Sequence, residues 1–151
     1  RIKTIVMTRK NQVKLAISRI TSARIHERTK ERYGSKAWNL YDEKDRLPPQ
    51  VIPVKEFQRV LDDVVKDIRR LDRFASTLNV PKLHLEYTDL LKDKQAWFKS
   101  VFDFLEIRSM ELDSNVRKNT NDDLRQCIVN FDELSQSVRD TPFESMFNEV
   151  A

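Results

Sequence analysis

Residues 3–18 read KTIVMTRKNQVKLAIS and contain two patterns in succession. Residues 3–8 are β-branched or apolar with almost no interruption and are too few for an amphipathic helix, so they predict a buried strand. From Asn11 onward, apolar residues recur at helical spacing as far as Ile25, which predicts a helix that runs to about Tyr33 and is stopped by Gly34. A strand, a tight turn at residues 9–10 and a helix make up half of a βαβ unit.

The rest of the chain predicts further helices and one more strand. Apolar residues between 54 and 78 step by three and four, which is the most regular helical pattern in the sequence. Residues 82–87 predict a second short strand, and a helix follows over 93–105. Residues 34–53 have no sustained period and hold three of the five prolines, so they predict a long irregular connection. Together these elements predict an α/β fold.

Composition limits the classes of function. The 151 residues suffice for one domain, and we expect a single domain over 1–151. The single cysteine, Cys127, excludes an intramolecular disulfide and a thiolate zinc site, and this fits a reducing, cytoplasmic setting. The net charge of +4 is spread over interspersed charges of both signs, so we expect no nucleic-acid polymer as partner. The apolar runs are far shorter than the roughly 20 residues of a membrane span, so we expect no membrane partner.

Arg9 and Ser18 are the first candidate site residues. Arg9 follows the first predicted strand, at the edge where ligands bind in open α/β sheets, and Ser18 lies nine residues on in the helix. A guanidinium can hold a phosphate through two hydrogen bonds, and a hydroxyl adds a neutral donor. From spacing alone, a solvated turn arginine and a packing serine remain the alternative. With a single glycine, the chain has almost no material for a Gly-rich phosphate loop, so an anion site has to come from side chains and helix N-termini.

Aromatic and basic residues downstream supply further candidates. Tyr87 closes the second predicted strand, where it could contact a planar base or simply pack in the core. Arg117 and Lys118 stand before a predicted helix, where they could contact a nucleotide phosphate or form a solvated surface. Trp38 and Tyr41 lie in the irregular segment, which could be an acceptor lid or a packed surface loop.

Metal and hydrolase chemistry find no support in the sequence. His26 and His84 are separated by a helix and a loop, with no carboxylate or cysteine at metal-ligand spacing, so we expect no metal site. The chain contains no Gly-x-Ser-x-Gly, Walker or paired-cysteine motif.

In their order along the chain, these segments resemble the carboxyl-terminal portion of a sulfotransferase that uses 3'-phosphoadenosine 5'-phosphosulfate. Residues 4–18, TIVMTRKNQVKLAIS, resemble the family's 3'-phosphate-binding segment, and their spacing is closest to the bacterial trehalose-type branch. Residues 83–93, LHLEYTDLLKD, are similar to its Tyr-Glu-Asp-Leu segment, with Thr88 in place of Glu. Residues 102–107, FDFLEI, are similar to its Phe-Leu-Gly-Ile helix, and residues 116–119, VRKN, resemble its Arg-Lys-Gly loop.

The resemblance implies a helix-rich, P-loop-like three-layer α/β fold, of which this chain supplies the part after the 5'-phosphosulfate loop. It implies that Arg9 and Ser18 bind the cofactor's 3'-phosphate, that Tyr87 lies beside the adenine, and that Arg117 and Lys118 close over the phosphates. The implied reaction transfers a sulfuryl group to the hydroxyl of a small molecule or glycan and releases adenosine 3',5'-bisphosphate, with no metal.

Within this scheme, residues 1–33 are the strand and helix of the 3'-phosphate segment, 34–53 the acceptor-side loop with Trp38 and Tyr41, and 54–151 a helical remainder with one strand. No catalytic residue is assigned, since the family's general base and 5'-phosphosulfate loop normally precede these segments; without that loop we expect very slow transfer. Two alternatives stay open. One is a non-catalytic helical interaction module, and the other is a nucleotide kinase-like P-loop enzyme.

Overall fold

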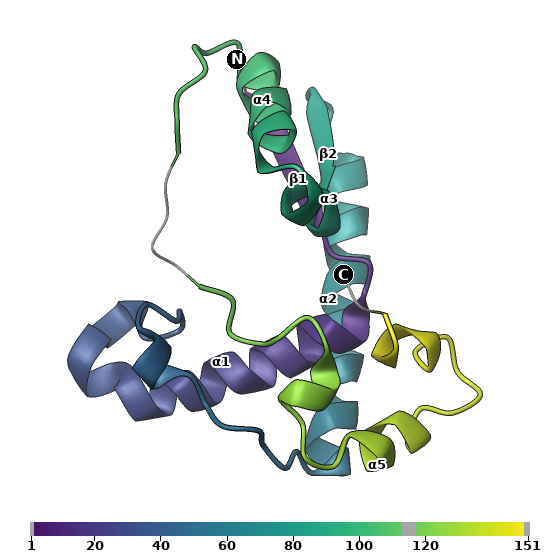
Figure 1. The fold of residues 1–151 in the computed structure, drawn as a ribbon. Helices are drawn as coiled ribbons and strands as arrows, with labels where there is room; N and C mark the ends of the chain where they lie inside the picture. Colours follow the sequence, from purple (N-terminus) through teal and green to yellow (C-terminus); the bar gives the residue numbers. More distant parts are fainter. Residues whose placement is uncertain (1, 113–116, 150–151) are drawn as a thin grey trace. The chain divides into compact units, whose positions relative to one another are not determined.

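The computed structural model describes residues 2–112 and 117–149 (Figure 1). Its helices and strands are, in order, β1 (Thr4–Thr8), α1 (Gln12–Tyr33), α2 (Val54–Thr77), β2 (Lys82–Glu86), α3 (Tyr87–Lys92), α4 (Lys94–Leu105) and α5 (Phe131–Gln136). Short 3₁₀ helices occupy Gly34–Lys36, Glu43–Asp45, Leu124–Gln126 and Ser145–Phe147. The chain packs as two compact units: unit 1 is Arg1–Lys10 with Val65–Asp113, and unit 2 is Asn11–Val64 with Ser114–Ala151.

Unit 1 is built around a two-stranded parallel sheet. The strands β1 and β2 run side by side, in a register that pairs Thr4 with Lys82 and Thr8 with Glu86 (Figure 1). Both strands were predicted, and a parallel pair joined through helices confirms an α/β class with a helix-rich composition. Helices α3 and α4 pack beside β2, and the side chain of Asp93 caps α4 by accepting a hydrogen bond from the backbone N–H of Ala96 at 2.9 Å.

The burial predicted for the first strand is only partly correct. Val6 is buried at 3% exposure, as expected, but Ile5 and Met7 are 38% and 52% exposed. The reason is that the sheet has two strands within the described residues, so β1 lies at an open edge, whereas a fully buried parallel strand needs neighbours on both sides.

Unit 2 is organised by α1, whose two ends match the sequence prediction. The side-chain oxygen of Asn11 accepts a hydrogen bond from the backbone N–H of Lys14 at 2.7 Å and so caps the first turn. At the other end the helix stops at Gly34, whose φ of 56° lies in the left-handed half of backbone space that glycine enters at little cost.

Aromatic rings from three segments form the core of unit 2. Phe57 of α2, Phe131 of α5 and Phe147 near the C-terminus are all buried, and the ring of Phe147 meets the other two edge to face, with centroids 5.6 and 5.4 Å apart. Asn130 joins α5 to the segment before α2, since its side chain bonds both the N–H and the carbonyl of Ile52. The segment before the C-terminus forms the short 3₁₀ helix Ser145–Phe147, which brings Phe147 into this core.

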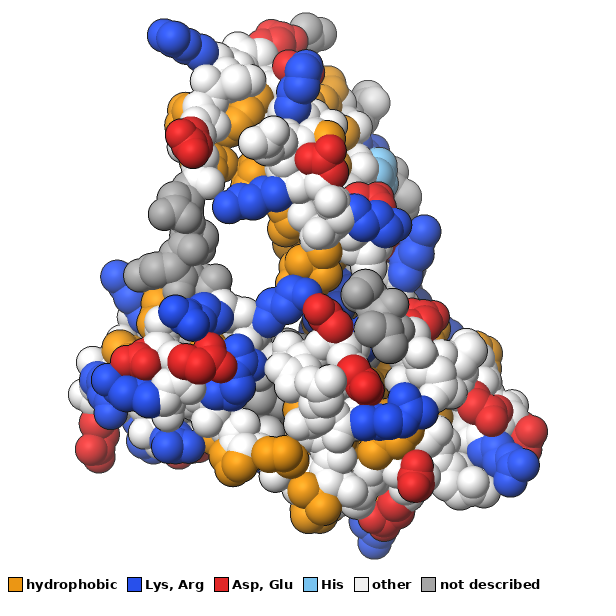
Figure 2. All heavy atoms as spheres, in the orientation of Figure 1, with side chains coloured by type: hydrophobic (Ala, Val, Ile, Leu, Met, Phe, Trp, Pro, Cys, Tyr) orange, Lys and Arg blue, Asp and Glu red, His pale blue; other side chains and the backbone are white. Residues whose placement is uncertain are grey.

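Charges of both signs are distributed over the surface. Figure 2 shows Lys and Arg side chains interspersed with Asp and Glu, in keeping with the mixed charge pattern of the sequence. Within the described ranges, no helix combines the length and apolarity that crossing a membrane requires.

We expect Asn11→Ala to lower the free energy of unfolding by about 2 kcal/mol, because it removes a helix cap and two further hydrogen bonds of a buried side chain. The amide nitrogen of Asn11 donates to the carbonyl of Met146 and to the carboxylate of Glu149, both at 2.7 Å. Asn11→Ser keeps a capping oxygen and loses the other two bonds, so we expect a smaller loss, about half as large. Chemical denaturation of both variants measures these values, and equal stability of Asn11→Ala and the wild type would contradict the capping role.

Candidate functional site

Unit 2 contains an open pocket of about 560 Å³ between α1, the segment 34–53 and the stretch that begins at Arg117. Its lining residues, most of them polar, are Ser18, Arg19, Ser22, Trp38, Asn39 and Asn119. The pocket therefore brings Ser18, predicted to bind cofactor, together with Trp38, predicted to bind acceptor, and with the neighbour of Lys118.

Asn119 joins the three segments that form this pocket. Its side-chain amide donates hydrogen bonds to the hydroxyl of Ser22 at 2.5 Å and to the backbone carbonyl of Trp38 at 3.3 Å. Among the described residues, positive φ values occur at Gly34, Glu106 and Asp140, so the backbone at Asn119 is in an ordinary conformation. An asparagine fits this position without strain and contributes a side chain to the pocket.

Trp38 is held on the pocket wall by a histidine of α1. Its indole ring stacks on the imidazole of His26, with centroids 4.3 Å apart and an angle of 11° between the planes, yet it stays 48% exposed. The Nδ1 atom of His26 is buried and has no hydrogen-bond partner in the described part of the chain. The other acceptor candidate, Tyr41, is half-buried and packs against Tyr33 at 5.6 Å. Only Trp38 of this pair lines the pocket.

The two predicted basic residues form ion pairs at the surface of unit 2. The backbone N–H of Arg117 donates to the carbonyl of Leu40 at 2.8 Å, and its guanidinium lies 3.2 Å from the carboxylate of Glu43. Arg46 and, to a smaller extent, Arg117 lower the pKa of Glu43 below its ordinary value. Lys118 pairs with Asp122 at 2.7 Å. Such exposed ion pairs contribute about 0–1 kcal/mol to the stability of the fold. A phosphate can therefore replace the carboxylates as the partner of these two side chains with little loss of stability.

Unit 1 holds the other two predicted cofactor residues, at the carboxyl ends of its strands. The guanidinium of Arg9 lies 5.0 Å from the centroid of the Tyr87 ring, which is a cation–π contact. The structure thus brings Arg9 and Tyr87 into contact. The predicted site residues fall into two groups, Arg9 with Tyr87 in unit 1 and Ser18 with Trp38, Arg117 and Lys118 in unit 2.

The structure also places residues at these sites that sequence reasoning did not select. Ser22 and His26 follow Ser18 at intervals of four, which puts all three on one face of α1, and this spacing could have revealed them. Asn119 and Glu86 carry no such signal, since their roles depend on segments far away in the sequence.

Comparisons with protein-family models, curated proteins and solved structures found no match to this chain.

The segment that carries Trp38 is tied to the end of α1 through Asp45. This buried carboxylate accepts hydrogen bonds from the hydroxyl of Tyr33 at 2.8 Å and from the guanidinium of Arg32 at 2.7 Å. The hydrogen bond from Tyr33 and then the charge and hydrogen bond of Arg32 outweigh the burial that opposes them, and they lower the pKa of Asp45. The contact fixes the middle of the 34–53 segment to the end of α1.

We expect Asp45→Asn to destabilise the protein at neutral pH and to have little effect in acid. Because the folded pKa of Asp45 is below its ordinary value of about 3.9, its charge stabilises the fold above pH 4. This contribution is lost as pH falls through the lower, folded pKa. Thermal unfolding from pH 7 to pH 2 tests this, with Asp62→Asn, an exposed carboxylate of α2, as the control. A difference between wild type and Asp45→Asn that is the same at every pH would exclude a role for the charge.

Proposed function

We propose that the chain is part of a sulfotransferase that binds 3'-phosphoadenosine 5'-phosphosulfate and transfers its sulfuryl group to an acceptor hydroxyl. The observation that supports this most is the pocket of unit 2, which joins Ser18, the segment 34–53 and Asn119. The resemblance assigns Ser18 to the cofactor and the segment 34–53 to the acceptor, and Asn119 directly follows Arg117 and Lys118, which the resemblance also assigns to the cofactor.

The chemistry of the pocket suits a phosphate dianion. The hydroxyl of Ser18 is a neutral donor, Asn119 holds the pocket wall together by donating to Ser22 and Trp38, and Arg117 and Lys118 bring two positive charges to the adjoining stretch. Charge-assisted hydrogen bonds from such groups favour a 3'-phosphate over a 3'-hydroxyl, which is the difference between this cofactor and ordinary adenine nucleotides. Arg9 and Tyr87 are the residues we propose for phosphate and adenine in unit 1.

A backbone detail of α4 supports the resemblance further. Glu106 stands where the family's Phe-Leu-Gly-Ile pattern has glycine, and it adopts φ 58° and ψ 39° at the C-cap of the helix. This left-handed conformation is one that glycine adopts readily and other residues rarely do. The ion pair between Glu106 and Lys3 at 2.8 Å helps to hold the residue in place. A glycine-type conformation at a family glycine position makes a chance match of this segment less probable.

In the proposed reaction, the acceptor hydroxyl attacks sulfur in line with the leaving group, and adenosine 3',5'-bisphosphate departs. We propose that the acceptor, a small molecule or glycan, lies against the segment 34–53, whose Trp38 presents half of its surface to solvent. The structure assigns no general base, and we leave that role without a residue.

A second candidate function, a helical interaction module, has one observation in its favour. The apolar stripe of α2 is buried at Phe57, Leu61 and Val64 but exposed at Leu71 and Phe74, by 39% and 63%. Exposed apolar residues on a long helix are what a partner surface needs. The described residues add no observation for the nucleotide kinase-like alternative.

Calorimetric titration with adenosine 3',5'-bisphosphate and with AMP distinguishes the two candidates. We expect the bisphosphate to bind more tightly than AMP. Arg9→Ala and Ser18→Ala should weaken bisphosphate binding and leave AMP binding nearly unchanged. For Arg9→Ala we expect a loss of about 10- to 150-fold, which corresponds to the 1.5–3 kcal/mol of a hydrogen bond to a charged group. Arg108→Ala, which removes an exposed arginine outside the site, is the control and should bind both nucleotides as the wild type does.

Equal affinity for the two nucleotides would contradict a 3'-phosphate site. If neither nucleotide binds, the interaction module becomes the better reading, and Phe74→Ser then tests whether the exposed stripe of α2 mediates association.

A further inference from the structure

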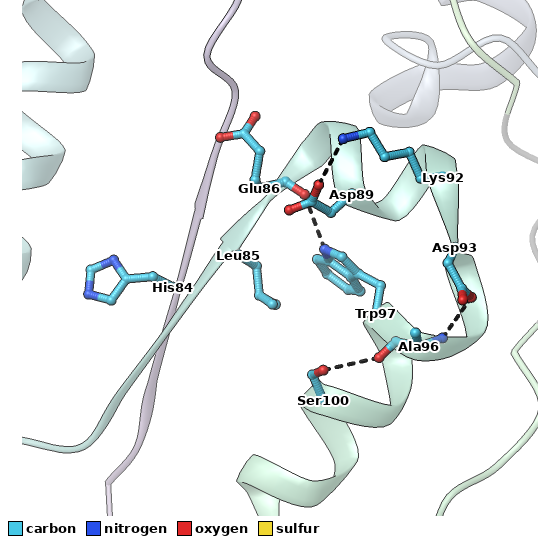
Figure 3. A pocket seen from close by; sticks show the side chains of 9 residues that line it. All are labelled: His84, Leu85, Glu86, Asp89, Lys92, Asp93, Ala96, Trp97 and Ser100. Carbon is cyan, nitrogen blue, oxygen red and sulfur yellow. Dashed lines mark hydrogen bonds and ion pairs between the residues drawn. The ribbon is translucent and has the colours of Figure 1, made fainter. Parts of the chain in front are cut away.

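The carboxylate of Glu86 connects the carboxyl ends of the two strands of unit 1. Glu86 is the last residue of β2, and its Oε1 atom accepts a hydrogen bond from the backbone N–H of Lys10 at 3.0 Å. Its Oε2 atom accepts one from the hydroxyl of Thr8 at 3.1 Å. Figure 3 shows this carboxylate directed toward β1 and away from the indole of Trp97.

These two hydrogen bonds involve the residues immediately before and after Arg9. Thr8 and Lys10 are its neighbours on either side, so one carboxylate holds both ends of the turn that carries the guanidinium. The next residue after Glu86 is Tyr87, whose ring lies 5.0 Å from that guanidinium. Glu86 therefore holds the residues on both sides of Arg9 and directly precedes Tyr87, the first residue of α3.

The backbone of Glu86 is itself held from α4. The indole Nε1–H of Trp97 donates to the carbonyl oxygen of Glu86 at 3.3 Å, as Figure 3 shows. A side chain whose own backbone is anchored loses less conformational entropy when it makes further contacts. Glu86 thus provides a fixed point between α4 and the turn after β1.

The arrangement also decides which donors of this turn can meet an anion. The backbone N–H of Lys10 would be a phosphate donor of the kind found after the first strand of many α/β folds, but here it donates to Glu86. This engagement of a backbone donor favours recognition of an anion at this edge by a side chain. A guanidinium selects a dianion by charge and geometry, while a backbone N–H discriminates less.

We propose that Glu86 is a positioning residue that holds Arg9 against Tyr87 for recognition of the cofactor's 3'-phosphate. This inference rests on the proposed function for the identity of the ligand. The two hydrogen bonds that the Glu86 carboxylate accepts from Thr8 and Lys10 are present without any ligand and are tested separately.

The first test measures the hydrogen bond between the Lys10 amide and Glu86 in the ligand-free protein. Hydrogen exchange at the amide of Lys10 should become at least tenfold faster in Glu86→Ala than in the wild type. Glu86→Gln should retain slow exchange, because its side-chain oxygen can still accept from this N–H. Asp89→Asn is the matched control, since Asp89 lies three residues on and pairs at the surface with Lys92. If hydrogen exchange at the Lys10 amide is unchanged in Glu86→Ala, Glu86 does not hold the turn that carries Arg9.

The second test is a double-mutant cycle read by titration with adenosine 3',5'-bisphosphate and AMP. We expect Glu86→Ala to weaken bisphosphate binding about tenfold, with AMP little affected and Glu86→Gln close to the wild type. In the Arg9→Ala background, Glu86→Ala should cause no additional loss, because the residue acts through Arg9. If Glu86 has a merely structural role, Glu86→Ala weakens the binding of both nucleotides equally, and its effect adds to that of Arg9→Ala.

The outcomes separate this inference from the proposed function. If the wild type prefers the bisphosphate and Glu86→Ala keeps that preference in full, the function stands and the positioning role fails. If the wild type shows no preference, the proposed function fails and the positioning role fails with it. Where Glu86→Ala does not fold, Thr8→Val removes one of the two hydrogen bonds, and an unchanged preference for the bisphosphate in that variant would overturn the inference.

Discussion

The side chain of Asn11 is the constraint on which the order of unit 2 depends. It is almost fully buried and makes three hydrogen bonds, one to the first turn of α1 and two to the C-terminal segment. A buried side-chain amide that lacks hydrogen-bond partners costs about 1–3 kcal/mol of stability. The first turn of α1 and the C-terminal segment are therefore both held at hydrogen-bond distance from Asn11. The start of α1 and the position of Phe147 in the core follow from this requirement.

Once α1 is fixed, its two faces serve different purposes. One face buries Val13, Ile17 and Ile25 in the core, and another presents Ser18 and His26 to the pocket or to Trp38. The hydroxyl of Ser18 therefore lies on a rigid helix, while the aromatic surface of Trp38 comes from an irregular segment anchored to the same helix. In the proposed function, a rigid donor would lower the entropy lost on binding, and the irregular segment would let acceptor specificity vary on a constant scaffold.

Sequence patterns were sufficient where one local signal decides the outcome. The limits of α1 followed from Asn11 and Gly34, because a cap and a glycine stop act within a single turn. The two strands were also predicted, but the exposure of Ile5 and Met7 was not, since burial depends on neighbouring strands rather than on the strand itself. The stack of His26 on Trp38 and the hydrogen bonds of Glu86 join segments that are distant in the sequence, so no local spacing predicts these contacts.

In the proposed function, the pocket of Ser18, Trp38 and Asn119 receives a nucleotide through its 3'-phosphate. Nuclear magnetic resonance on the ¹⁵N-labelled chain tests this most directly, because the indole N–H of Trp38 and the amides of Ser18 and Asn119 report on three sides of the pocket. Saturation with adenosine 3',5'-bisphosphate should shift all three resonances, and AMP should shift them less. Unchanged resonances at these three positions, with the nucleotide in saturating excess, would contradict the claim.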